Sequence, residues 1–89
     1  MNDNDIFKYM KLVAEEFKKI RKERKLTLED VAFDLGVSSS YIGKIENGYL
    51  KKLSFYMYIK LADYYEVDLK DLIDKADYKY EVYKAFFDY

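Results

Sequence analysis

The chain has 89 residues with no His, Cys, Trp or Pro, and 16 basic and 17 acidic side chains give a formal net charge of −1. This length predicts a single domain. Without Cys there are no disulfides or Cys-ligated metals, and without His the usual imidazole base of catalysis is missing. Short apolar runs and the absence of a signal-peptide pattern predict a cytoplasmic protein. With no His, no Cys and no phosphate-binding loop, we expect no enzyme activity, and no metal or cofactor.

Apolar residues recur at spacings of three and four almost throughout, and only three glycines interrupt them. This pattern predicts an all-α domain with short connections. A first helix is expected from near Asp5, because one apolar stripe runs through Ile6, Met10, Val13, Phe17 and Ile20.

The next two helices are expected close together. Thr27 is an N-cap candidate for a helix from 28 to 35, and Gly36 is suited to end it. Ser38 is the cap candidate for a helix that continues to about Asn47, where Gly48 follows.

Two further helices complete the chain. Ser54 is the cap candidate for the first, and Asp68 for a last helix from Leu69 to near Asp88. The last helix carries a largely aromatic stripe that needs a cover. The stripe is either intramolecular core packed on the first helix or a dimer seam, and we favour the seam; its residues are Ile73, Ala76, Tyr80, Tyr83 and Phe87.

Residues 28–48 carry the most specific pattern. Ala32 allows two helices to cross closely, and Gly36 tolerates the positive φ of a tight turn between them. Apolar residues anchor the inner face of the second helix of this pair. Its outer face is left with small or hydrogen-bonding residues, namely Ser39, Ser40, Gly43, Lys44 and Asn47. Such a face suits reading of the DNA major groove.

Residues 17–73 resemble the helix-turn-helix domain of the phage lambda repressor and Cro family, the Xre-type regulators. The resemblance rests on Val31-Ala32, Leu35-Gly36-Val37-Ser38, Ile45-Glu46-Asn47-Gly48 and the flanking helices, matched in order and spacing. It implies a five-helix, lambda-repressor-like DNA-binding domain that occupies residues 1–89 as one domain, with residues 74–89 as a helical extension. It also implies a homodimer on a palindromic double-stranded operator, acting as a repressor or autoregulator.

The resemblance implies a set of site residues. The residues implied to read bases are Ser39, Ser40, Gly43 and Lys44. Those implied to contact phosphate are Thr27, Ser38, Asn47, Tyr49, Lys51 and Lys52. Arg21 and Glu46 match a family ion pair. The sequence departs from the family at Leu28, where Gln is common, and before Ser54, where Pro is common.

Several of these residues have a second interpretation. Ser38 is favoured as a helix cap over a base contact. Gly43 could serve a close approach to DNA or close packing of helices, and the basic run 18–25 could steer DNA or be a solvated face. The alternative to a DNA-binding regulator is a protein-interaction module, antitoxin-like or anti-regulatory, that uses the Tyr-rich C-terminal helix.

The net charge hides an uneven distribution. Residues 1–60 carry a balance of +3, and residues 61–89 a balance of −4. The sequence therefore predicts a basic part that faces DNA and an acidic tail that stays away from phosphate.

Overall fold

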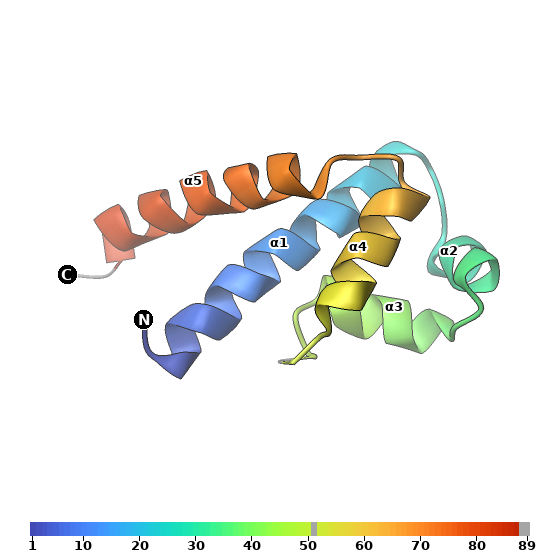
Figure 1. Ribbon diagram of the computed structural model, residues 1–89, viewed down its shortest axis with the longest axis horizontal. Helices are drawn as coiled ribbons and strands as arrows, with labels where there is room; N and C mark the ends of the chain where they lie inside the picture. Colours follow the sequence, from blue (N-terminus) through green and yellow to red (C-terminus); the bar gives the residue numbers. More distant parts are fainter. Residues whose placement is uncertain (51, 88–89) are drawn as a thin grey trace.

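The computed structural model describes residues 1–50 and 52–87, and for Phe87 the backbone alone. The described residues form helices joined by short turns, with no strand, which confirms the expected all-α, lambda-repressor-like fold (Figure 1). The helices are α1 (Asp3–Glu23), α2 (Leu28–Leu35), α3 (Ser39–Glu46), α4 (Phe55–Tyr64) and α5 (Leu69–Phe87). None of the helices is long and apolar enough to cross a membrane, within the part of the chain that the structure describes.

Side-chain caps fix where the helices begin. Helix α1 starts two residues before the expected Asp5, because Asn2 and Asp5 form a capping box: the Asp5 backbone N–H donates to Asn2 Oδ1 over 2.9 Å. The expected caps of α2, α3 and α4 are confirmed, since Thr27, Ser38 and Ser54 each accept a hydrogen bond from the backbone N–H three residues later. For α5, the backbone N–H of Lys70 donates to Asp68 Oδ1.

The turn between α2 and α3 contains a glycine with the expected left-handed backbone conformation. Gly36 has a φ of +71°, and its N–H bonds back to the end of α2. Val37 then donates its backbone N–H to the carbonyl of Ala32, so the chain reverses within a few residues. Ala32 is 4% exposed, consistent with a small residue where α2 and α3 approach each other.

The hydrophobic core lies where α1, α2, α3 and α4 meet. Phe17 of α1 stacks on Tyr65 at the end of α4, with ring centroids 6.3 Å apart. Ile42 and Ile45 of α3 and Leu61 of α4 are almost fully buried in the same cluster. The inner faces of α2 and α3 therefore pack against the rest of the domain.

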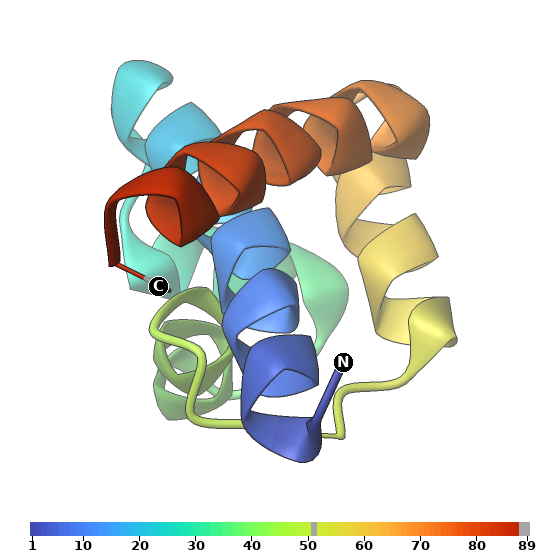
Figure 2. The ribbon, with the colours of Figure 1, turned by 90° about the vertical axis from the view of Figure 1, so that its left-hand side faces the viewer.

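Helix α5 folds back along α1 in the opposite direction (Figures 1 and 2). Tyr80 packs edge-on against Tyr9 of α1 with ring centroids 5.6 Å apart. The Tyr9 hydroxyl donates to Asp77 over 2.8 Å, and burial together with this carboxylate raises the pKa of Tyr9 to about 12. The exposed Lys79 amine pairs with the buried carboxylate of Glu16.

These contacts give the aromatic stripe a cover within the chain. Ala76 and Tyr80, which the sequence interpretation favoured as dimer contacts, are 0% and 6% exposed because they lie against α1. Tyr83 is half-buried beneath the Lys8 amine, which lies 3.5 Å from the ring centroid. Ile73 is half-buried, and the side chain of Phe87 lies outside the described residues. The intramolecular alternative thus describes Ala76 and Tyr80.

Candidate nucleic-acid interface

Helix α3 is anchored through its inner face. Ile42 and Ile45 are each 1% exposed, and the half-buried Val37 packs against the same core before the helix begins. The opposite face of α3 carries no large apolar side chain. Ser40 and Lys44 are exposed there, with Ser39 and Gly43 half-buried beside them and Asn47 exposed at the C-cap. The structure therefore brings the predicted base-reading residues together on one accessible face.

A buried ion pair fixes the C-terminal end of α3. Arg21 donates from Nε to Glu46 Oε2 over 2.8 Å and from Nη2 to Glu46 Oε1 over 3.0 Å, and its Nη1 donates to the Leu26 carbonyl. The hydrogen bond with Glu46 is the main reason that the pKa of Arg21 is raised. This is the pair that the resemblance implied. It neutralises a carboxylate that would otherwise lie unpaired at the end of α3.

The predicted phosphate contacts at the helix N-termini also serve as caps. Thr27 Oγ1 and Ser38 Oγ each accept a backbone N–H, so these residues hold α2 and α3 in place, as the cap interpretation of Ser38 expects. Both residues are exposed. The Thr27 N–H donates to Asp30, and the hydrogen bonds with Thr27 lower the pKa of that carboxyl group. Asp30 therefore places a negative charge at the start of α2.

The loop after α3 presents further predicted contacts. Asn47 and Lys52 are exposed, and Tyr49 is 73% exposed. Lys51 lies outside the described residues. The Asn47 side-chain oxygen accepts a hydrogen bond from the Lys18 amine over 3.1 Å. Lys18 of α1 is thereby drawn to the end of α3.

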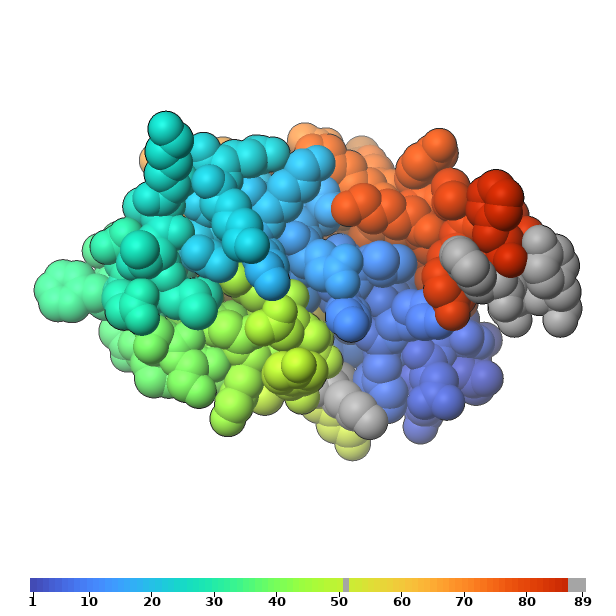
Figure 3. All heavy atoms as spheres, turned by 180° about the vertical axis from the view of Figure 1, so that it is seen from behind, coloured from blue at the N-terminus to red at the C-terminus, as the bar shows by residue number. Residues whose placement is uncertain are grey.

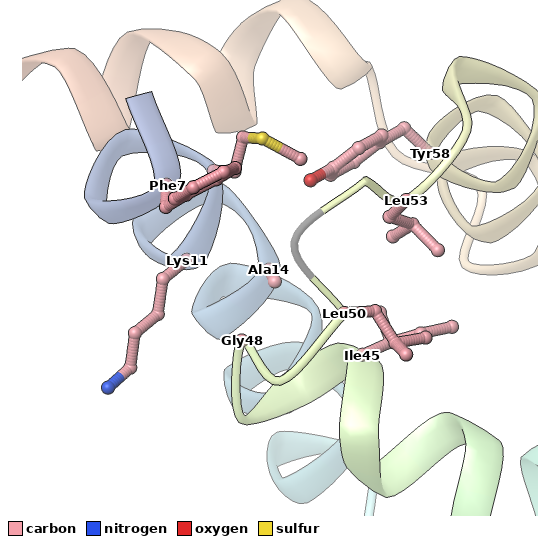
Figure 4. Close-up of a pocket in the computed structure, with 9 residues that line it drawn as sticks. Phe7, Lys11, Ala14, Ile45, Gly48, Leu50, Leu53 and Tyr58 are labelled. Carbon is pink, nitrogen blue, oxygen red and sulfur yellow. The ribbon is translucent and has the colours of Figure 1, made fainter. Parts of the chain in front are cut away.

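Lys11 is a second α1 lysine beside this loop, and sequence reasoning did not single it out. Gly48 has a φ of +72°, and a Cβ atom there would lie 2.9 Å or less from three side-chain carbons of Lys11. Figure 4 shows Lys11 beside Gly48, with its amine pointing away from the pocket that Ala14 and Ile45 help to line. In the space-filling view, the surfaces of α1 and of α3 with its following loop are continuous (Figure 3). The signal in the sequence is the seven-residue spacing of Lys11 and Lys18, which places them on one face of α1.

The basic run 18–25 is divided by the fold. Lys18 reaches α3, Arg21 is buried in its ion pair, and the Arg24 guanidinium lies 5.5 Å from the centroid of the Tyr65 ring. These basic residues therefore do not form a single surface. Within the part of the chain that the structure describes, Lys18 is the residue of the run that contacts the exposed end of α3.

Packing does not require glycine at position 43. A Cβ atom there would lie 3.6 Å from Cδ1 of Leu28, which is an ordinary van der Waals distance. Leu28 is the residue at which the sequence departs from the Gln common in the family, and it is half-buried beside α3. Close packing of helices therefore does not explain why residue 43 is a glycine.

A helix pair with a tight left-handed turn and an exposed, small-residue second helix defines the helix-turn-helix class of domain. A family model described as "Helix-turn-helix" matches residues 17–72. The chain belongs to this family, in its Xre type, as the resemblance predicted. Membership also confirms the expectation that this domain is not an enzyme.

The chain is similar to the HTH-type transcriptional repressor RghR of Bacillus subtilis (strain 168). The two are 36% identical over 76 residues, which cover 85% of this chain and 56% of the relative. The chain thus spans about half the length of the curated relative that it matches.

Proposed function

We propose that the protein is a sequence-specific regulator of transcription that binds double-stranded DNA with α3 in the major groove. The observation that carries the proposal is the exposed face of α3, which combines small polar residues with a helix fixed from behind by Ile42 and Ile45. The major groove is about 12 Å wide, and it admits a helix whose outward side chains are small. The name of the B. subtilis relative supports repression as the direction of control.

The proposed base contacts follow from the chemistry of this face. Lys44 is exposed and can donate to the O6 and N7 acceptors of guanine. The hydroxyls of Ser39 and Ser40 can donate to or accept from several bases, so they set orientation more than identity. Gly43 lets the backbone of α3 approach the DNA closely.

The proposed phosphate contacts lie at the N-terminus of α2 and at both ends of α3. Thr27 and Ser38 stand at helix N-termini, where backbone N–H groups favour anions. Asn47, Tyr49, Lys51 and Lys52 are the proposed contacts after α3, and the placement of Lys18 and Lys11 beside this loop adds two cations on the same side. Such contacts fix the register of α3 on the duplex.

We propose a homodimer on a palindromic operator as the working form. Two α3 helices related by a two-fold axis reach successive major grooves when their centres are about 34 Å apart. Residues 74–89 are proposed to extend the family core, residues 17–73, within one domain, because Ala76 and Tyr80 pack on α1. A role on DNA also agrees with the expected cytoplasmic location.

Selection of binding sites from random duplex DNA tests this function. The expected result is a palindromic consensus with half-sites one helical turn apart. On the selected duplex, Lys44→Ala and Ser40→Ala are expected to lower the affinity measured by fluorescence anisotropy. Parental affinity of both variants would contradict the assignment of α3 as the reading helix.

A second candidate function rests on the outward face of α5. Tyr78 and Phe86 are 73% and 65% exposed, and Val82 between them is 38% exposed, so an apolar stripe at four-residue spacing faces solvent. This stripe favours a protein-interaction module. Tyr78→Ser with Phe86→Ser is the suitable test, because deletion of residues 78–89 would also remove Tyr80 from the core. Loss of a captured partner with retained DNA binding would support this candidate.

A further inference from the structure

The backbone at the C-terminal end of α3 is poorly suited to hold a phosphate group. The backbone N–H groups of Asn47, Gly48 and Tyr49 donate back to carbonyls of α3, over 3.0, 3.1 and 2.9 Å. The C-terminal end of a helix also carries the partial negative charge of the helix dipole, which repels an anion. A phosphate group at this end must therefore be held by side-chain donors.

A lysine of α1 contacts the side chain that lies at this end of α3. The Lys18 amine donates to Asn47 Oδ1 over 3.1 Å, where the loop after α3 lies beside α1 (Figures 1 and 2). Asn47 is exposed, and Lys18 is half-buried with its aliphatic stem along the protein surface. The contact therefore joins two helices at a point that DNA can reach.

This contact determines which way the Asn47 amide faces. An ammonium group has three donors and no acceptor, so the amide oxygen faces it and the amide NH₂ group cannot. The Asn47 Nδ2 group therefore points away from Lys18, and it has no acceptor within the part of the chain that the structure describes. Because the phosphate oxygens of DNA accept hydrogen bonds, this is the orientation that a phosphate contact needs.

The positive charge of Lys18 is also left for a ligand. Lys18 forms no ion pair among the described residues, and its acceptor on Asn47 is a neutral amide oxygen. The carboxylate that precedes Asn47 in the chain, Glu46, is already paired with Arg21. The ammonium charge beside the end of α3 is therefore not neutralised within the described residues.

We propose that Lys18 orients the Asn47 amide and that the two side chains together bind one phosphate of the DNA backbone. Nδ2 of Asn47 and the remaining N–H groups of Lys18 are the donors of this site, which we name the Lys18–Asn47 site. The ammonium group supplies a charge-assisted hydrogen bond, which is stronger than a neutral one. The inference rests on the proposed function, and it adds how the phosphate contact after α3 is built.

Two substitutions of Lys18 and one matched control test the site. Lys18→Met keeps a long, flexible stem with a similar helix propensity, but it removes the charge and the donors. Lys18→Arg keeps both. Lys19→Met is the control, because Lys19 is the next residue, is exposed and lines a hollow with Asp74 of α5. Circular dichroism and urea unfolding of the full chain check that each variant is folded.

NMR of the free protein measures the orientation of the amide without DNA. We expect the heteronuclear NOE of the Asn47 side-chain amide to match that of the α3 backbone in the parent, in Lys18→Arg and in Lys19→Met. In Lys18→Met it should fall to the value of a mobile side chain. An equally ordered amide in Lys18→Met, or a mobile one in the parent, overturns the positioning role of Lys18.

A double-mutant cycle on the selected operator measures the coupling between the two residues. We expect Lys18→Met and Asn47→Ala each to weaken binding about tenfold, and Asn47→Ala to cost less than about twofold once Lys18→Met is present. Lys18→Arg should restore the full effect of Asn47→Ala, and Lys19→Met should bind like the parent. If the two losses multiply, Lys18 does not act through Asn47, and the proposal is overturned.

Duplexes that carry one neutral methylphosphonate at each operator phosphate in turn identify the bound group. We expect a position in each half-site where the parent loses affinity, and where Lys18→Met and Asn47→Ala then lose nothing further. Two different positions for the two variants would overturn a shared site.

The outcomes for this site and for the proposed function are distinguishable. If Lys44→Ala weakens operator binding while Lys18→Met and Asn47→Ala act independently, the DNA-binding function stands and the Lys18–Asn47 site fails. If no selected DNA binds, the phosphate site fails together with the function, even where the free protein has an ordered Asn47 amide.

Discussion

Gly43 is the residue at which stability and binding should oppose each other. Glycine inside a helix costs about 1 kcal/mol relative to alanine. Because a Cβ atom at this position meets Leu28 at an ordinary 3.6 Å, the cost is not explained by packing. We expect Gly43→Ala to raise the free energy of unfolding by about 1 kcal/mol in urea titrations. The same variant should bind the selected operator more weakly in anisotropy measurements. Equal or tighter binding would show that DNA does not approach this backbone closely.

Tyr65 carries a polar group in the core. The residue is 1% exposed, and its hydroxyl has no hydrogen-bond partner in the described part of the chain. Burial is the main cause that raises the pKa of Tyr65 to about 12, with Glu46 adding to it. An unpaired buried hydroxyl has already incurred its desolvation cost, so its removal should not destabilise the fold.

We therefore expect Tyr65→Phe to leave the free energy of unfolding unchanged or to raise it by up to about 1 kcal/mol. Tyr65→Leu is the control, because it removes the ring that stacks on Phe17 and should destabilise the protein. Thermal and urea unfolding measure both. A clear loss of stability in Tyr65→Phe would mean that the hydroxyl is paired in solution.

At the scale of elements, the Arg21–Glu46 pair connects α1 to the end of α3. Both side chains are buried, and removal of one partner leaves the other charge without compensation. We expect Glu46→Leu to lower the free energy of unfolding by roughly 3–5 kcal/mol. The double variant Arg21→Met with Glu46→Leu should recover most of this loss, measured by urea titration. Additive losses in the double variant would argue against the pair as the cause.

Helix α5 is held to α1 by Tyr80, which makes the C-terminal extension part of the fold. Tyr80 is 6% exposed and packs edge-on against Tyr9. We expect Tyr80→Ala to cost roughly 3–5 kcal/mol of stability, as for other large buried aromatics. Tyr78→Ala, two residues earlier at 73% exposure, is the matched control and should change stability by at most about 0.5 kcal/mol. Similar unfolding midpoints for the two variants would show that α5 is not part of the cooperative core.

At the scale of the whole molecule, the fold separates the two charge balances. Lys18 meets the end of α3, while the acidic α5 runs along α1 toward the end of the molecule that is distant from α2 (Figure 1). Lys18 and Lys11 therefore bring positive charge beside the C-terminal end of α3, while Asp30 keeps a negative charge at the start of α2. This arrangement predicts DNA binding that falls with salt concentration.

The slope of log K against log salt tests the contribution of Lys18. Each phosphate contact adds about 0.9 to the magnitude of the slope on duplex DNA, and a dimer makes each contact twice. We expect Lys18→Ala to reduce the magnitude by about 1.8. Lys84→Ala, near the end of α5 and paired with Glu81, is the control and should leave the slope unchanged. An unaltered slope in Lys18→Ala would remove α1 from the DNA contact surface.

The helices and the exposed face of small polar residues on α3 can be predicted from the residues alone. Caps such as Thr27 and Ser38, and a turn glycine such as Gly36, act within a few residues of themselves, so local chemistry reveals them. The alternation of anchoring and small polar residues in 39–47 likewise follows from the helical period. The helix-turn-helix class could therefore be predicted from one short stretch.

What each helix face packs against could not be predicted in the same way, because it depends on contacts between distant parts of the chain. Periodicity shows that the stripe of Ala76 and Tyr80 is apolar, but it cannot show whether α1 or a second chain covers it. The short α4–α5 connection and the pairing of Tyr9 with Tyr80 and Asp77 direct that stripe inward. The same folding leaves Phe55 and Ile59 uncovered and brings Lys11 to Gly48. Such contacts join residues distant in the chain, and the helical period alone does not identify their partners.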